Sequence, residues 1–313
     1  MKQNNQFFED VNLDHEIDLM EIFSVVKAGK KLIGLITGFT ALASLIVALS
    51  LPNIYTSSAL LAPAEQSGGG MSGLMKQYSG LASLAGVSLP SMEEGSRAQL
   101  GIQLMQSRAF IGEFLERRKL LPELMAIDSY DVESGNVTFN KGIYDASENK
   151  WVRRVELPYK PKPSLLESHH AFTEILSVSE DNQNGFVTVS IEHKSPIIAA
   201  KWVNWLVEDI NSTMRNQDIE EATKSIEYLK QQVSDTALTD LQVLFFELIQ
   251  SQTETIMLAN VRPEYVFKTI DPAVISEEKS KPRRLLIFFM GLMLGAALGI
   301  VTVIVLHYSK HNN

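Results

Sequence analysis

The chain has 313 residues, of which 45% are hydrophobic and 21% are charged, and its formal net charge is −9. A protein that binds nucleic acid through its phosphates needs a basic surface, so this charge argues against a nucleic-acid partner. The sequence contains no cysteine, which excludes disulfides and thiolate chemistry. The average composition hides the main feature of the chain, because much of its apolar content lies in two blocks.

The first block runs from Leu32 to Leu51 without a charged side chain. A helix of about 20 apolar residues can cross the hydrocarbon core of a bilayer, so we predict a membrane-spanning helix here. The block exceeds the roughly 7–15 apolar residues of a cleaved signal peptide, which favours an uncleaved anchor. Gly34 and Gly38 form a G-x-x-x-G pair, a spacing that lets spanning helices approach closely.

The region after this block alternates between strand and helix patterns. Residues 53–62 predict a strand that ends at Pro63, and residues 67–90 are rich in glycine and serine, which predicts a loosely packed excursion. Residues 93–120 predict a helix. Further strands are predicted at 136–139, 151–157, 174–179, 186–192 and 265–270. Together these elements predict an α+β domain.

A long helical stretch follows the hairpin predicted around residues 180–185. Ser195–Pro196 is a typical helix start. Apolar side chains then recur at spacings of three and four, which is typical of the seam of a coiled coil or bundle. The seam consists of Ile219, Ala222, Ile226, Leu229 and Val233.

This helix cannot continue unbroken to residue 259, because the chain must return to the membrane over residues 260–284. Residues 234–240 offer a break, where Thr239 and Gln242 are spaced as a capping box for a second helix. We therefore predict an outbound helix of about 55 Å and a shorter returning helix, which together form an extended antiparallel arm.

The second apolar block runs from Leu285 to Leu306 and also predicts a spanning helix. Gly291, Gly295 and Gly299 lie on one face of it. This spacing predicts close packing against the first span or against a neighbouring subunit.

Charges beside the two blocks give opposite indications of orientation. Lysines precede the first block and none follows until Lys76, which favours a cytoplasmic N-terminus. The second block is preceded by Lys279, Lys281, Arg283 and Arg284 and followed only by Lys310. Because the first helix usually dominates and long loops translocate regardless of charge, we place the central domain outside the cytoplasm.

Known catalytic patterns are absent from the sequence. It contains no G-x-x-x-x-G-K-[ST], H-E-x-x-H or G-x-S-x-G run. His169–His170 is interpreted as part of a solvated loop, and Trp202 and Trp205 are interpreted as core residues in preference to a sugar-binding platform. We therefore predict no catalytic residue, no cofactor and no metal site.

Several segments in order resemble the chain-length determinant family, the Wzz-type polysaccharide co-polymerases of Gram-negative bacteria. The segments that carry the resemblance are Glu16–Ile22, Gly29–Lys31, Pro52–Ser57, Leu60–Pro63, Gly80–Gly86, Pro272, Pro282, Gly295–Ala296 and Gly299. The chain departs from the family pattern before the second span, where Glu277–Glu278 occupies a region that usually holds more prolines.

The resemblance implies a non-enzymatic homo-oligomeric ring in the bacterial inner membrane. Such proteins set the modal length of a lipid-linked polysaccharide, usually the O-antigen of lipopolysaccharide, together with a Wzy-type polymerase; the lipid-linked polysaccharide itself is a further candidate partner. The alternative is a co-polymerase for capsule, enterobacterial-common-antigen-like or exopolysaccharide synthesis or export. A two-span sensor and a pump adaptor fit less well, because the tails leave no room for an output module and adaptors usually end outside the membrane.

The predicted architecture is an α+β membrane protein with two transmembrane helices that flank a periplasmic α/β domain carrying an extended antiparallel helical arm. The predicted divisions are a cytoplasmic tail at 1–31, a first span at 32–51, a periplasmic domain at 52–284, a second span at 285–306 and a cytoplasmic tail at 307–313. Within the periplasmic domain, the α/β base is predicted at 52–195 and 262–278, and the arm at about 196–260.

Overall fold

The computed structural model describes residues 19–64, 95–131, 134–236 and 238–311. The chain divides into two compact units, one made from residues 1–52 and 282–313 and the other from Asn53–Lys281. We call them the helical unit and the central unit and describe each by itself. The predicted glycine-rich stretch at 67–90, including Gly80–Gly86, lies outside the described residues.

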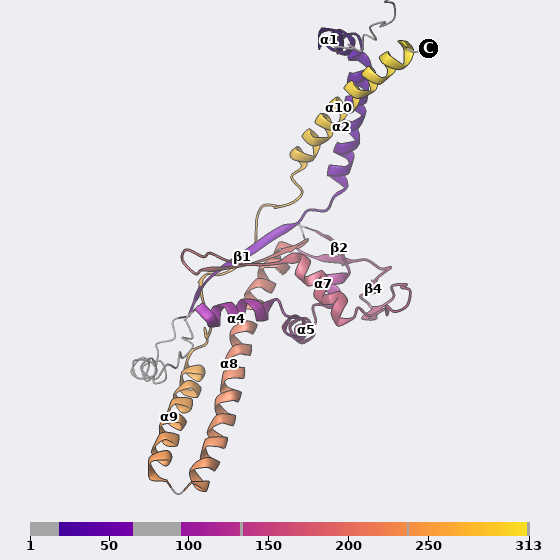
Figure 1. The fold of residues 1–313 in the computed structure, drawn as a ribbon. Coiled ribbons are helices and arrows are strands. Elements are labelled where there is room, and N and C mark those ends of the chain that lie inside the picture. The colour runs from indigo at the N-terminus through magenta and orange to yellow at the C-terminus, as the bar shows by residue number, and fades with distance from the viewer. Residues whose placement is uncertain (1–18, 65–94, 132–133, 237, 312–313) are drawn as a thin grey trace, which may run out of the picture. The chain divides into compact units, whose positions relative to one another are not determined.

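The helical unit contains α1 (Leu19–Ala28), α2 (Lys30–Ser50) and α10 (Arg284–His311). Helices α2 and α10 pack along each other (Figure 1). Among the residues that the structure describes, two segments are long and apolar enough to cross a membrane, Lys30–Ser50 with a mean hydropathy of 2.3 and Arg284–Ser309 with 2.5. Helix α2 starts two residues before the first apolar block, at Lys30, and α10 continues five residues past the second, to His311.

A four-stranded antiparallel sheet forms the base of the central unit. Its order is β6-β7-β1-β8. The strands are β1 (Tyr55–Pro63), β6 (Leu176–Glu180), β7 (Val187–His193) and β8 (Phe267–Asp271). Side chains of β7 alternate between buried and half-buried positions, so only one face of the sheet turns to the core. The strands predicted near these positions are confirmed.

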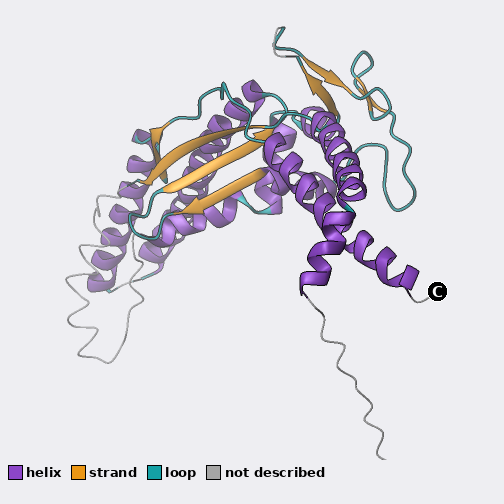
Figure 2. Ribbon diagram, turned by 90° about the horizontal axis from the view of Figure 1, so that it is seen from above, coloured by secondary structure: helices purple, strands orange, loops and turns teal. Residues whose placement is uncertain are grey.

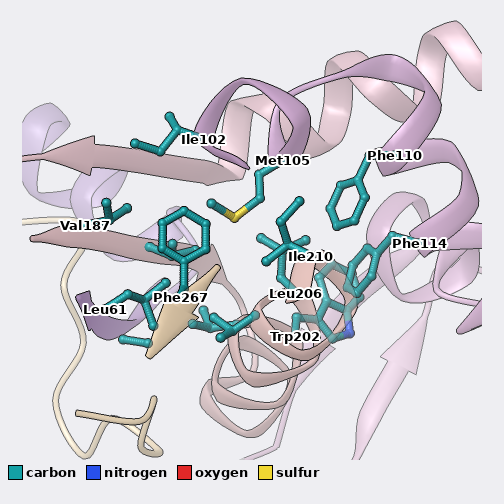
Figure 3. Close-up of a cluster of buried hydrophobic side chains, with 14 of the residues drawn as sticks. Leu61, Ile102, Met105, Phe110, Phe114, Val187, Trp202, Leu206, Ile210 and Phe267 are labelled. Atoms are coloured by element: carbon teal, nitrogen blue, oxygen red, sulfur yellow. The ribbon is translucent and has the colours of Figure 1, made fainter. Parts of the chain in front are cut away.

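Helices cover one face of this sheet (Figure 2). They are α4 (Gly95–Met105), α5 (Arg108–Arg117), α6 (Leu121–Met125), α7 (Leu165–Ile175) and the first half of α8 (Pro196–Asp235). Their apolar side chains meet those of β1, β7 and β8 in one core. Figure 3 shows several of its largest side chains, among them Met105, Phe114, Trp202, Leu206, Ile210 and Phe267.

Three sequence-based expectations about this base are wrong. The helix predicted at 93–120 is interrupted at Ser107, whose hydroxyl accepts a hydrogen bond from the Phe110 N–H at 3.2 Å and starts α5. Of the strand predicted at 151–157, only Trp151 lies in a strand. His169–His170 lies on α7, a helix that begins at a capping box made by Ser164 and Glu167.

Two small hairpins stand beside the main sheet. The first pairs β2 (Ile127–Tyr130) with β3 (Val137–Phe139), and the second pairs β4 (Tyr144–Asp145) with β5 (Lys150–Trp151). The strand predicted at 136–139 is the second strand of the first hairpin. Rings of Phe139, Tyr144 and Trp151 pack on one another with centroid separations of 5.7 and 5.0 Å.

The arm consists of α8 and α9 (Thr239–Val261), which pack side by side (Figure 1). Helix α8 has 40 residues and α9 has 23, which correspond to about 60 Å and 35 Å. The break between them falls within the predicted residues 234–240. The predicted capping box is wrong, however. Leu238 occupies the cap position of α9, and the Gln242 side chain donates instead to the carbonyls of Val233 and Thr236 at 3.4 and 2.9 Å.

His193 joins the end of β7 to the start of α8 and is buried. Its Nδ1 accepts a hydrogen bond from the Ser195 N–H at 3.0 Å, and its Nε2 lies 3.1 Å from the Glu123 carbonyl oxygen. Burial lowers the pKa of the imidazole below its ordinary value of 6.5, against the opposing effect of the Glu123 hydrogen bond. Protonation would also disrupt the contact with the Ser195 N–H.

We predict that this histidine makes the central unit less stable in mild acid. Because its folded-state pKa is below its unfolded-state pKa, the unfolded chain binds more protons and stability rises with pH. The stability that neutral His193 contributes is complete above pH 6.5. It is lost as the pH falls through the folded-state pKa of this imidazole. Thermal unfolding of the purified chain between pH 7.5 and 5 should show a falling melting temperature. In His193→Asn the fall should be smaller, and an unchanged pH dependence would contradict the prediction.

Candidate functional site

The glycines of the second apolar helix face the first helix at very short range. A Cβ atom on Gly295 would overlap the Thr40 hydroxyl and lie 3.0 Å from the Thr37 Cα. One on Gly291 would overlap the Ser44 side chain. One on Gly299 would lie 3.1 Å from the Ile33 Cα. The absence of side chains at these three positions thus allows the two helix backbones to approach closely.

The residues of α2 that face these glycines are not the predicted pair, Gly34 and Gly38. A Cβ on Gly34 or Gly38 would find no described atom within 4 Å, so these two glycines lie away from α10. The stripe of α2 that contacts α10 is Ile33, Thr37, Thr40 and Ser44. The signal for it was present in the sequence as small polar residues at helical spacing.

Two of the three hydroxyl groups in this stripe are bonded within α2, whereas the Thr37 hydroxyl is buried without a hydrogen-bond partner among the described residues. Thr40 Oγ1 donates to backbone carbonyls of its own helix at 3.0 and 3.1 Å, and Ser44 Oγ donates to the Ala41 carbonyl at 2.9 Å. Small residues with internally satisfied hydroxyls are typical of interfaces between spanning helices. Gly29 adds a further close approach that sequence reasoning missed, because its Cβ would overlap the Val303 side chain.

The seam residues of the arm lie at partly or fully buried positions. Ala222 is 2% exposed, and the other four members, Ile219, Ile226, Leu229 and Val233, are half-buried. A buried small residue with half-buried larger ones at this spacing fits the close packing of two helices.

The two prolines singled out from the sequence lie in different units. Pro272 lines an open cleft of about 400 Å³ between α8 and the segment that carries β8. Beside it, the Asn204 side chain exchanges two hydrogen bonds with the backbone of Ala273, at 2.9 and 3.1 Å. In the helical unit, the Pro282 carbonyl accepts from the Arg284 N–H at 3.0 Å at the start of α10.

The two tryptophans of α8 have different environments. Trp202 is completely buried in the core. Trp205 is only half-buried, and its ring is flanked by the cationic groups of Arg118 at 4.8 Å and Lys201 at 4.5 Å from the centroid. The interpretation of both as core residues is therefore correct for Trp202 and incomplete for Trp205.

Buried charge near Trp205 is paired. Asp209 is 2% exposed and accepts from Arg117 and Arg118, each at 2.7 Å. The hydrogen bond to Asp209 raises the pKa of the Arg118 guanidinium above its ordinary value. This cluster joins α5 to α8. Among the described residues, no group of three or more histidine, aspartate or glutamate side chains could hold a metal ion.

Residues 15–117 match the family model of the chain length determinant protein, Wzz. Over this segment the chain is similar to the Wzz chain length determinant family. The segment comprises the described parts of α1, α2, β1, α4 and α5, and the resemblance inferred from the sequence is confirmed.

Two solved structures match the chain at low similarity. One is titled "full-length bacterial polysaccharide co-polymerase"; it is 13% identical, covers 95% of this chain and 99% of its own, and has a TM-score of 0.40. The other is "Fragment of WzzB, Polysaccharide Co-polymerase from Salmonella Typhimurium", 12% identical, with 73% and 100% coverage and a TM-score of 0.28. No curated protein sequence matches the chain.

Proposed function

We propose that this protein regulates the chain length of the O-antigen of lipopolysaccharide without catalysing a reaction itself. The observation that carries the proposal is the family match over residues 15–117. The two apolar helices, Lys30–Ser50 and Arg284–Ser309, support a membrane location for the ends of the chain. In this proposal they cross the bacterial inner membrane, both termini lie in the cytoplasm, and the central unit lies in the periplasm.

The proposed partners are further copies of the chain, arranged as a ring, and a Wzy-type polymerase in the same membrane. Within one chain, the glycine face of α10 brings two helices close together, and α8 and α9 pack side by side as an arm. A regulator of this kind acts by binding and positioning, so it requires neither a metal nor a cofactor.

The proposal predicts a specific change in surface polysaccharide when the gene is deleted. O-antigen should still be made, but its modal length should be lost and the distribution should become broad. Lipopolysaccharide extracted from wild-type, deleted and complemented strains should show this directly as a ladder on a gel. Complementation with the unaltered chain is the control and should restore the modal band.

Two results would overturn the proposal. An unaltered O-antigen ladder in the deleted strain would refute the assignment. A normal ladder accompanied by altered length of a capsule or exopolysaccharide would move the function to that polymer.

A further inference from the structure

A basic and apolar loop stands out from the rest of the central unit. It comprises β5 and the segment that follows it towards α7, residues 150–162, and we call it the basic loop. The chain as a whole has a net charge of −9, but the basic loop carries five basic residues against one acidic residue, Glu156. Its charge is therefore opposite to that of the protein that carries it.

Apolar side chains of the basic loop are turned to solvent. Leu157 is 94% exposed and Tyr159 is 56% exposed, and Val152 and Val155 are also exposed. A single exposed leucine is common on soluble proteins and needs no explanation. Four such side chains within one short positively charged loop form a local surface that is both apolar and cationic.

The loop is held in this shape by contacts at its base. The Arg153 guanidinium donates to the carbonyls of Pro161 at 2.7 Å and Lys160 at 2.8 Å, and it pairs with Glu167 of α7 at 2.8 Å. Pro163 is buried just beyond the loop. The exposed apolar tip is therefore presented on a closed loop, which lowers the conformational entropy that a binding partner would have to remove.

Arg153 is occupied by these contacts, whereas the other cations point to no internal partner. Lys150, Arg154, Lys160 and Lys162 are exposed. Within the described part of the chain, none of the four forms an ion pair. Their charges are thus available to an external anionic surface.

The hairpin of β2 and β3 lies near the end of the central unit at which β1 starts. The first and last residues of that unit lie together, because Ile54 pairs with Lys281. Strand β1 starts there, and the Tyr55 ring contacts the Tyr130 ring of β2 edge-on, with centroids 6.4 Å apart. The start and the end of the central unit therefore lie beside the first hairpin.

We propose that the basic loop binds the surface of a bilayer that contains anionic phospholipids. Cationic side chains interleaved with leucine and aromatic residues are typical of segments that lie in the headgroup region. A protein partner is a weaker fit, because lysine is depleted at protein–protein interfaces and this loop contains three lysines. The inference rests on the membrane location within the proposed function, and it is independent of polysaccharide length.

Acidic side chains in the two hairpins reduce the positive electrostatic potential around the basic loop. The Ser134 hydroxyl donates a hydrogen bond to the Asp131 carboxylate at 2.7 Å, and the Ser147 hydroxyl donates one to the Asp145 carboxylate at 2.5 Å. These bonds do not remove their negative charge. Binding should therefore depend strongly on salt, because it relies on the short-range attraction of the loop's own cations.

The absence of cysteine from the chain allows a direct test. Leu157→Cys would be labelled with an environment-sensitive fluorophore in the full-length protein. The protein would then be placed in lipid discs that contain either phosphatidylglycerol or only phosphatidylcholine. In anionic discs, the emission should shift to the blue and be quenched by brominated lipid, and high salt should reverse both effects. Leu238→Cys, at the exposed turn of the arm (63% exposed), is the matched control and should show neither effect.

A charge-reversal variant isolates the contribution of the cations. Lys160→Glu combined with Lys162→Glu should abolish the shift at residue 157, whereas Lys230→Glu on the arm should leave it unchanged. Circular dichroism checks that each variant is folded.

Three outcomes would overturn the inference. One is a water-like emission at residue 157 in both kinds of disc. A second is an equal shift in both kinds, which would show insertion without charge recognition. The third is a shift that occurs in detergent without lipid and disappears on dilution, which would show that another copy of the chain covers the loop. None of these results depends on the O-antigen ladder, so failure here is distinct from failure of the proposed function.

Discussion

Replacing Gly295 with leucine is expected to force α2 and α10 apart. A Cβ at this position would already overlap the Thr40 hydroxyl and lie 3.0 Å from the Thr37 backbone. A backbone atom cannot move aside as a flexible side chain can, so the added leucine must displace the whole helix. Overpacking in tight interiors costs about 1–3 kcal/mol, and the lack of free space on this face favours the upper end.

The chain offers a matched control for this substitution. Gly38→Leu introduces the same side chain in the partner helix, where no described atom lies within 4 Å of the new Cβ. Thermal unfolding in detergent should show a markedly lower melting temperature for Gly295→Leu and little change in it for Gly38→Leu. In the complemented deletion strain, the first variant should also fail to restore the modal O-antigen band. Equal behaviour of the two variants would show that the glycine face of α10 is incidental.

Replacing Asn211 with alanine is expected to destabilise the central unit. This side chain is 4% exposed and lies on α8 beneath the start of β8. Its Oδ1 accepts from the N–H groups of Val266 and Phe267 at 2.8 and 2.9 Å, and its Nδ2 donates to the Phe267 carbonyl at 2.9 Å. Alanine would leave these buried backbone groups without the bonds that Asn211 supplies. Each unsatisfied group costs about 1–3 kcal/mol, so we expect a total loss of about 3 kcal/mol or more.

Asn204 provides the comparison, because it makes a similar pair of bonds to Ala273 at an exposed position on the same helix. Water can replace those bonds, so Asn204→Ala should cost less than about 1 kcal/mol. Urea unfolding followed by tryptophan fluorescence would measure both variants. Similar losses for the two would mean that burial does not decide the effect of removing these side chains.

Local sequence patterns predicted the elements whose formation depends on nearby residues. The apolar blocks at 32–51 and 285–306 correspond to α2 and α10. A run of about 18 or more apolar residues by itself indicates a helix. The strands predicted at 53–62 and 186–192 correspond to β1 and β7. Ser195–Pro196 marked the start of α8 correctly, because a capping hydroxyl and a proline at the first turn act within four residues.

Two other features were missed, the short helix α7 and the cap of α9. Helix α7 is only 11 residues long, and its Ser164–Glu167 capping box is the signal that could have located it. The cap of α9 failed for a different reason. Gln242 reaches back across the turn to the carbonyl groups that end α8, and this interaction exists only once the two helices have folded against each other.

The sequence by itself therefore determined the two apolar helices, the main strands and the arm with its break, because hydrophobic periodicity and helix caps act over a few residues. Only the tertiary structure decided which small residues meet. Gly291, Gly295 and Gly299 face the first helix, whereas Gly34 and Gly38 do not. It also decided that Trp202 is completely buried while Trp205 is only half-buried. Both choices depend on the rotation of a helix about its own axis, which is set by the shape of its packing partner and not by spacing along the chain.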